Sequence, residues 1–279
     1  MDETAQFAYL KPLPLYEKET PYHNFIDSTT NIVTNRPHPQ SVVDIRGKTE
    51  DFTLGTHGFE FRVHPLPAVN WQDEGEIKEV YIGDLKALVH DLIPERIERC
   101  EMFDFRLRSV GALQKNVPRH PGLCGTYKMP PAMTSPLGVL EWLKREIGGD
   151  EANTIVNRHR VRVINIWRPL VEVVQDYPLA MCDSRTVKPS DLVHSAHVSS
   201  DYVRRNYLVK YSKDFRFYYL SKMTKSEICA FVVFDSLAVG KDHVRTPPHS
   251  AFRHTELPRS DTQPRESIEV RLLVLTPLG

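Results

Sequence analysis

The chain of 279 residues has little of several features that would point to a class of protein. It has four cysteines, Cys100, Cys124, Cys182 and Cys229, and no CxxC spacing. A disulfide framework is therefore not expected, and the thiols are predicted to be free and buried. The 13 glycines are outnumbered by 21 prolines, which is typical of many loops and short strands. The 36 basic and 36 acidic residues cancel. No overall field therefore favours nucleic acid or an anionic membrane.

Long apolar runs are missing as well. No window approaches the roughly 18 apolar residues of a membrane span. The N-terminal sequence MDETAQFAYLKPLPLYEKE is acidic and has no apolar core of the kind found in signal peptides. There is no GxGxxG, P-loop, GxSxG or HExxH motif. We expect a soluble, cytoplasmic protein with no nucleic-acid or membrane partner, and the sequence does not indicate an oligomeric state.

The chain is long enough to bury a sizeable core, and we expect a single domain over residues 1–279. Residues 1–50 read as an extended arm packed on the body. Helical spacing predicts a helix over Glu76–Leu92, and a second helix between a Ser135 cap and Gly148. Alternation and turn residues predict strands at 52–63 (two), 100–107, 160–168, 207–211, 215–220, 228–234 and 267–275. The pattern favours a mainly β fold with flanking helices, such as a jelly roll or a similar antiparallel barrel.

The stretch RVRVINIWRPLVEVVQDYPLAMCDSR, residues 160–185, is the densest mixture of charge and apolar sequence. An extended chain places on one face Val161, Val163, Asn165 and Trp167. It places on the other face Arg160, Arg162, Ile164, Ile166 and Arg168. Such a strand either lies at a sheet edge or lines a polar pocket. We also expect ion pairs that lock the following loop, drawn from Arg168, Asp176, Asp183 and Arg185.

Two further segments carry candidate chemistry. His249 lies in TPPHSAFR, where flanking prolines would hold it rigidly, as suits a metal ligand, a general base or a buried structural histidine. On the last strand, Arg265, Ser267 and Arg271 share one face, where an Arg and a Ser two apart can bind a carboxylate. An exposed polar edge is the alternative. The pair His194 and His197 is a weak metal candidate, because no carboxylate completes it.

Several motifs together resemble one family. They are YLKPLPLYEKETPY, DIRGKTEDFTLGTHGFEF, FDFRLR, INIWRPL, DYPLAMCDSRTV, YLVKYSKDFRFYYLSKMTKSE and the TPPHSAFR to PRESIEVR segment. These are similar to the fungal AsaB-like hydroxylase/desaturase family, over nearly the whole chain. The resemblance implies a tailoring enzyme of secondary metabolism with the double-stranded β-helix (jelly roll) of the Fe(II)/2-oxoglutarate oxygenases. It also implies that two histidines and one carboxylate hold the iron.

The family pattern places a His-x-Asp just before the second helix, and there this sequence reads Pro131-Ala132-Met133. Phe105 stands where relatives often carry His. A Met thioether is a soft ligand that does not suit iron(II) with oxygen donors. The resemblance retains His249 as the distal ligand and Arg265 with Ser267 as the carboxylate-binding pair. His120, in a proline-rich loop, is the nearest substitute for the missing ligand.

Three functions stay open. In the first, the barrel has lost its metal, needs no cofactor and catalyses an isomerisation, dehydration or cyclisation of a small natural product. In the second, Fe(II) and 2-oxoglutarate bind at a rearranged site that includes His249, and the protein hydroxylates or desaturates its substrate. In the third, the protein keeps the oxygenase fold without catalysis and serves as a binding or scaffold protein. The catalytic candidates are His249, Arg265 and Asp183. The candidate substrate contacts are Phe105, Met133, Trp167, Arg168, Ser267 and Arg271.

Overall fold

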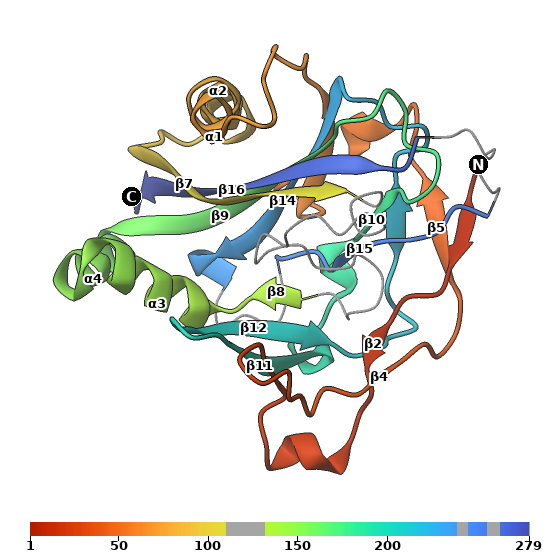
Figure 1. Ribbon diagram of the computed structural model, residues 1–279, viewed down its shortest axis with the longest axis vertical. Coiled ribbons are helices and arrows are strands. Elements are labelled where there is room, and N and C mark those ends of the chain that lie inside the picture. The colour runs from red at the N-terminus through yellow and green to blue at the C-terminus, as the bar shows by residue number, and fades with distance from the viewer. Residues whose placement is uncertain (110–131, 239–244, 256–262, 279) are drawn as a thin grey trace.

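The computed structural model describes residues 1–109, 132–238, 245–255 and 263–278, and it is built mainly of strands (Figure 1). Five of its strands form one antiparallel sheet, here called the main sheet, with the strand order β6-β14-β9-β16-β7. These strands are β6 (Phe59–Val63), β14 (Glu227–Asp235), β9 (His159–Pro169), β16 (Glu266–Pro277) and β7 (Arg99–Ser109). The predicted strands at 100–107, 160–168, 228–234 and 267–275 are therefore confirmed.

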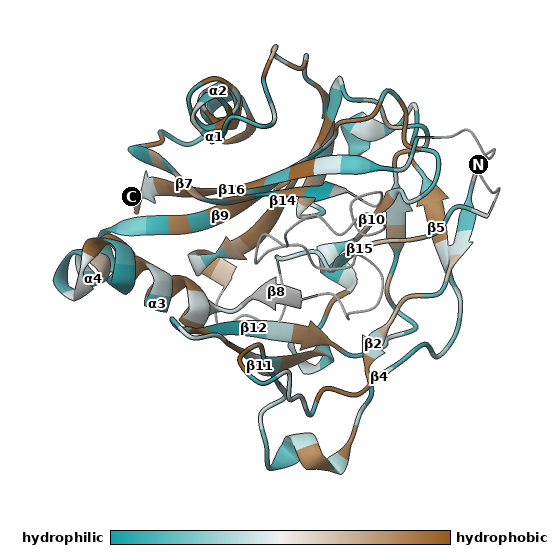
Figure 2. Cartoon of the chain, viewed as in Figure 1, coloured by the Kyte–Doolittle hydropathy of each residue, from teal (hydrophilic) through white to brown (hydrophobic). Residues whose placement is uncertain are grey.

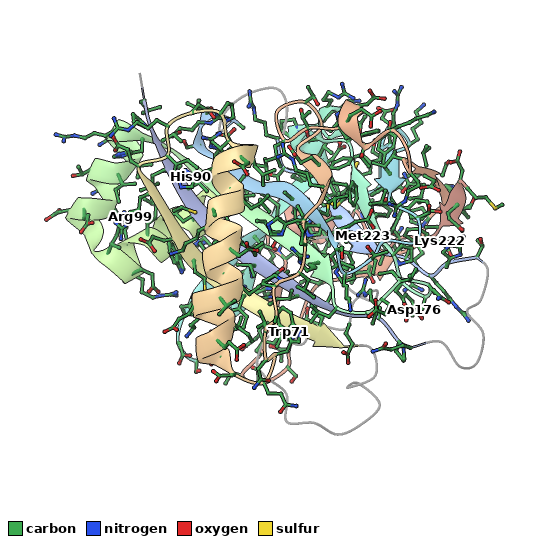
Figure 3. All side chains as sticks on the ribbon, turned by 90° about the horizontal axis from the view of Figure 1, so that it is seen from above. Trp71, His90, Arg99, Asp176, Lys222 and Met223 are labelled. Carbon is green, nitrogen blue, oxygen red and sulfur yellow. The ribbon has the colours of Figure 1, made fainter. Side chains whose placement is uncertain are left out.

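One helical segment covers the outer face of this main sheet (Figure 3). It consists of α1 (Glu74–Glu76), a π-helical turn η3 (Ile77–Tyr81) and α2 (Ile82–Leu92), so the helix begins two residues earlier than predicted. Asp73 caps it by accepting hydrogen bonds from two backbone amides. Apolar side chains of the helix pack on Ile164 and Ile166 of β9 and on alternate residues of β16. We call the opposite side of the sheet the inner face.

The second sheet has the order β1-β5-β13-β10-β15 and lies toward the N-terminus in Figure 1. Its strands are β1 (Glu3–Ala5), β5 (Gln40–Asp44), β13 (Phe217–Tyr219), β10 (Leu179–Cys182) and β15 (His249–Ala251). Residues 1–50, predicted as an extended arm, therefore contribute strands to the sheets. They also form the pair β2 (Tyr9–Leu10) and β4 (Thr34–Asn35), and a short 3-10 helix η1 (Pro14–Glu17).

A four-stranded sheet faces the inner side of the main sheet across the molecule (Figure 1). Its order is β3 (Tyr22–Asn24), β11 (Leu192–Val198), β12 (Val203–Val209) and β8 (Ala132–Thr134). Strand β11 was not predicted, and the predicted strand at 207–211 overlaps β12 only at residues 207–209. Of the two strands predicted at 52–63, only β6 forms. Short 3-10 helices join the strands: η2 (Thr49–Asp51), η4 (Ser184–Thr186), η5 (Pro189–Asp191) and η6 (Ser236–Ala238).

Helices α3 (Pro136–Ile147) and α4 (Gly149–Arg158) connect β8 to β9. The predicted cap is confirmed, because Ser135 Oγ accepts a hydrogen bond from the Gly138 amide at 3.2 Å. Gly148 ends the helix at φ 89°, a conformation that favours glycine. Helix α4 was missed, because it contains few apolar residues, of which Ala152 and Ile155 are buried.

The core follows the strand alternation. Figure 2 shows apolar residues along the central parts of β9 and β14. Inward-facing residues such as Val163, Trp167 and Phe231 form a second cluster with α3 and α4. Among the described residues, no helix is long and apolar enough to cross a membrane.

Candidate active site

His249 lies at the start of β15, directly after two prolines, and its ring contacts the inner-face ring of Phe231 at 4.4 Å between centroids. Its Nδ1 is 3.1 Å from the carbonyl oxygen of Pro247. A carbonyl only accepts, so Nδ1 carries the proton and Nε2 keeps its lone pair. Burial lowers the pKa of His249, and Glu269 partly opposes this. His249 is therefore a neutral imidazole with Nε2 as a base or ligand.

Strand β16 carries its polar side chains on the inner face and not on an exposed edge, while Ile268 and Val270 pack under the helix. Arg265 is 2% exposed and donates from Nη1 to the carbonyl of Tyr177 at 2.7 Å. Its guanidinium lies 5.7 Å from the ring centre of Trp167. Within the described residues, Arg265 Nε and the fully buried Ser267 Oγ have no hydrogen-bond partner. Buried polar atoms rarely stay unpaired, so this pair fits a bound carboxylate.

The next inner-face residue of β16 is Glu269, whose carboxylate is already paired with an arginine. Glu269 accepts two hydrogen bonds from Arg108 of β7, at 2.9 and 3.0 Å. Burial opposes the charge of Glu269, but Arg108 and the nearby Arg271 and Arg106 overcome it and lower its pKa to about 2. Glu269 is therefore a fixed negative charge beside His249, and its oxygens are committed to Arg108.

Iron does not fit the donor set of the described residues. Across residues 1–109, 132–238, 245–255 and 263–278, no group of three His, Cys, Asp or Glu side chains is placed to hold a metal. Pro131 and His120 lie outside the described residues, as do the side chains of Ala132 and Met133. The proposed substrate contact of Met133 therefore stays a prediction, and the described part of the site offers His249 alone to a metal.

Two predicted substrate contacts lie on the wrong face. Phe105 packs with the residues beneath the helix, because Asp104 and Arg106 take the inner-face positions of β7. Arg168 is fully buried on the same outer side and donates to the carbonyls of His64 and Lys225, each at 2.7 Å. The prediction that these two residues line the substrate site is wrong. Arg168 instead fixes the loops at the end of the sheet.

Asp183, a predicted catalytic residue, has a structural role. Its carboxylate accepts from Arg185 Nη2 at 2.7 Å and from the Arg185 amide at 3.0 Å, which caps η4. The expected ion pair is therefore confirmed, but Asp176 does not join it: it accepts from the Arg265 amide at 3.0 Å. With its oxygens bound to Arg185, Asp183 is not positioned as an acid or base.

The histidine pair on β11 does not form a metal site. His194 and His197 are three apart on a strand, so they point to opposite faces. The ring of His194 contacts that of Tyr207, whereas His197 is close to His23 and Phe25.

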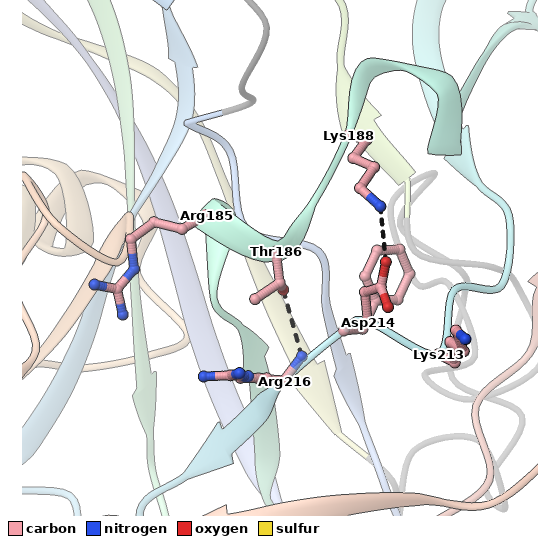
Figure 4. A pocket seen from close by; sticks show the side chains of 7 residues that line it. Arg185, Thr186, Lys188, Lys213, Asp214 and Arg216 are labelled. Atoms are coloured by element: carbon pink, nitrogen blue, oxygen red, sulfur yellow. Dashed lines mark hydrogen bonds and ion pairs between the residues drawn. The ribbon is translucent and has the colours of Figure 1, made fainter.

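A hollow of about 440 Å³ lies elsewhere on the surface, between η4 and the turn before β13 (Figure 4). Its rim carries Arg185, Lys188, Lys213 and Arg216, and Lys188 pairs with Asp214 at 2.7 Å. Apart from Arg185, it contains none of the residues discussed above. The polar inner face with His249 is the better candidate site.

This barrel, with a histidine on β15 and an Arg-x-Ser pair at the start of β16, has the jelly roll of the iron(II)/2-oxoglutarate oxygenases. The chain belongs to the family described as oxidoreductase/YMDC permease-like domain (YDMC), whose model matches residues 7–275. It is an enzyme of an oxidoreductase family that includes fungal hydroxylase/desaturases.

Individual relatives agree with this assignment. The chain is 29% identical over 250 residues to the Fe(II)/2-oxoglutarate-dependent dioxygenase nvfI of Aspergillus novofumigatus, covering 85% of this chain and 83% of the relative. It is also 29% identical over 262 residues to the hydroxylase/desaturase efuI of Hormonema carpetanum, with the same coverage. A solved structure of a variant of the iron and alpha-ketoglutarate-dependent endoperoxidase NvfI superposes with a TM-score of 0.80 at 24% identity over 100% of both chains.

Proposed function

We propose that this enzyme performs a non-redox tailoring step on a small natural product: an isomerisation, dehydration or cyclisation. The observation that carries the proposal is the Nε2 of His249, which has no hydrogen-bond partner among the described residues and lies beside the cationic inner face. The sequence supports it, because Pro131, Ala132 and Met133 stand where the family pattern has its His-x-Asp ligands.

In this reaction His249 Nε2 accepts a proton from the substrate and returns it at another atom. Proton transfer by a positioned histidine typically contributes about 10² to 10⁴ in rate. The inner-face Arg265 stabilises the negative charge that develops when the proton leaves. Trp167 forms an apolar wall that orients the substrate.

The test uses the metabolite that accumulates when the gene is deleted. Purified protein with EDTA should convert it to a product of equal mass, or to one that has lost water. The variant His249→Ala should lower this rate more than tenfold, a loss above about 1.4 kcal/mol in barrier stabilisation. His90→Ala, on the exposed side of α2, is the matched control (Figure 3). A product that gains oxygen or loses two hydrogens, and only without EDTA, would contradict the proposal.

A second candidate function is favoured by the unpartnered Arg265 Nε and Ser267 Oγ. These atoms fit one carboxylate of 2-oxoglutarate, which together with iron would supply the electrons that activate dioxygen, the oxidant for hydroxylation or desaturation. The relative nvfI is named as dependent on both. Purified protein would then contain iron and convert 2-oxoglutarate to succinate. Absence of both, in protein purified without chelator and supplied with iron(II), would remove this candidate.

A further inference from the structure

Two arginines of the inner face share one carboxylate oxygen. Arg271 Nη2 is 2.6 Å from Asp104 Oδ2, and Arg106 Nη2 is 3.4 Å from the same atom. Asp104 lies directly opposite Arg271 in the β7–β16 pairing, and Arg106 is two residues along β7, so all three side chains share the inner face. Their formal charges sum to one excess positive charge.

This excess is poorly solvated. The side chains of Arg271 and Arg106 are 10% and 22% exposed. Arg271 Nε is buried with no hydrogen-bond partner among the described residues. Burial and the nearby Arg271 lower the pKa of Arg106 to about 10. Leaving a buried charge without a counter-charge is costly, so a bound anion would stabilise this cluster.

His197 of β11 adds a neutral donor from the opposite sheet. Its Nδ1 lies 3.3 Å from Asn206 Nδ2, which can only donate. The proton of His197 is therefore on Nε2, which is buried and has no partner among the described residues. Burial, with the charges of Arg204, His23 and Arg106, lowers the pKa of His197 to about 4. His197 thus lies near Arg106 and stays neutral.

An aromatic wall borders the arginines. The Arg271 guanidinium is 5.7 Å from the ring centre of Phe103, and Phe103 stacks on Trp142 of α3 at 4.0 Å. A ligand at this place meets two cations, a neutral N–H donor and aromatic surface. That combination suits a carboxylate attached to an apolar or aromatic body.

We propose that Arg106, Arg271 and His197 form an anion subsite that binds a carboxylate of the substrate. The proposal rests on the proposed function in one respect, that the substrate is a small molecule held on the inner face. The subsite is distinct from the Arg265–Ser267 pair. Ser267 and Arg271 are four residues apart on β16, which is about 13 Å along a strand. The bidentate Arg108–Glu269 pair lies between them.

The experiment compares benzoate with its neutral analogue benzamide, by calorimetric titration of the full chain without turnover. We expect the wild type to bind benzoate at least tenfold more tightly than benzamide. Arg106→Met should remove that preference and Arg106→Lys should restore part of it. Arg99→Met, at the exposed start of the same strand, should leave it unchanged. Arg265→Met should also leave benzoate binding intact, although it should abolish binding of 2-oxoglutarate wherever the wild type binds it.

Equal binding of benzoate and benzamide by the wild type would overturn the subsite, and so would an unchanged preference in Arg106→Met. Loss of benzoate binding in Arg265→Met would also overturn it, because the anion would then lie at the Arg265–Ser267 pair. The wild-type comparison needs no variant, so it decides even where Arg106→Met folds poorly. His197→Gln provides a further variant and should weaken benzoate relative to benzamide. Failure of the proposed function would appear elsewhere, as a metal requirement for turnover.

Discussion

Arg168 of β9 donates from Nε to the hydroxyl of Tyr81 at 3.1 Å, and both side chains are fully buried between the main sheet and its helix. The same guanidinium also contacts the ring nitrogen Nδ1 of His64 at 2.5 Å. A single side chain thus ties together a strand, a helix and the loop after β6. This explains why an arginine in an apolar strand is a structural residue here.

Replacing Arg168 with Met should destabilise the protein by about 3–5 kcal/mol, because it leaves the carbonyls of His64 and Lys225 buried without donors. Tyr81→Phe removes the acceptor of one guanidinium hydrogen bond and should cost less, about 1.5–3 kcal/mol. Urea unfolding of both variants measures the difference. Similar losses of unfolding free energy in the two variants would show that Arg168 contributes no more than its single hydrogen bond to Tyr81.

The Glu269–Arg108 pair predicts an acid-dependent stability. The folded pKa of Glu269 lies below its ordinary value, at about 2, so its contribution is complete above pH 4.5 and is lost as pH falls toward 2. The difference corresponds to on the order of 3 kcal/mol. Unfolding free energies from pH 6 to pH 2 should show a shallower decline in Glu269→Gln than in the wild type. Glu146→Gln, on the exposed side of α3, serves as control, and equal slopes in all three would contradict the assignment.

Helix α3 approaches strand β12 closely at Gly138. A Cβ there would stand 2.4 Å from the carbonyl oxygen of Arg205. Gly138→Ala should therefore cost about 1–3 kcal/mol, although alanine is the better helix former. Gly83→Ala in α2 meets no atom within 4 Å and should stabilise by up to about 1 kcal/mol. Thermal unfolding that moved in the same direction for both would refute the close contact.

Asp183 combines a helix cap with an ion pair, and two variants separate them. Asn caps nearly as well as Asp, so Asp183→Asn mainly removes the charge that pairs with Arg185. Asp183→Ala removes both and should lose about 1 kcal/mol more in chemical denaturation. Equal losses would mean that the cap contributes little. Arg185 is more than half exposed, so the ion pair itself should be worth under about 1 kcal/mol.

Much of the secondary structure could be predicted from local sequence. The Ser135 cap, the glycine stop at Gly148 and the alternation of β9 and β16 each depend on residues within a few positions, and all are confirmed. Helix α4 was missed because it contains few apolar residues. Strand β11 was missed because its apolar pattern is weak and part of its pairing is with the distant strand β3. The same alternation that places Trp167 on the inner face already places Arg168 on the other, so the two could never line one site.

By itself, the sequence determined the family, the retained His249 and Arg-x-Ser pattern, and the absence of family ligands at Pro131 to Met133. Only the tertiary structure decided which side of each strand faces the helix, and hence that Phe105 is under it. Only the structure brought Asp104, Arg106 and Arg271 together with His197 from a distant sheet. Periodicity fixes which residues share a face, whereas burial, pairing and net charge depend on what that face meets.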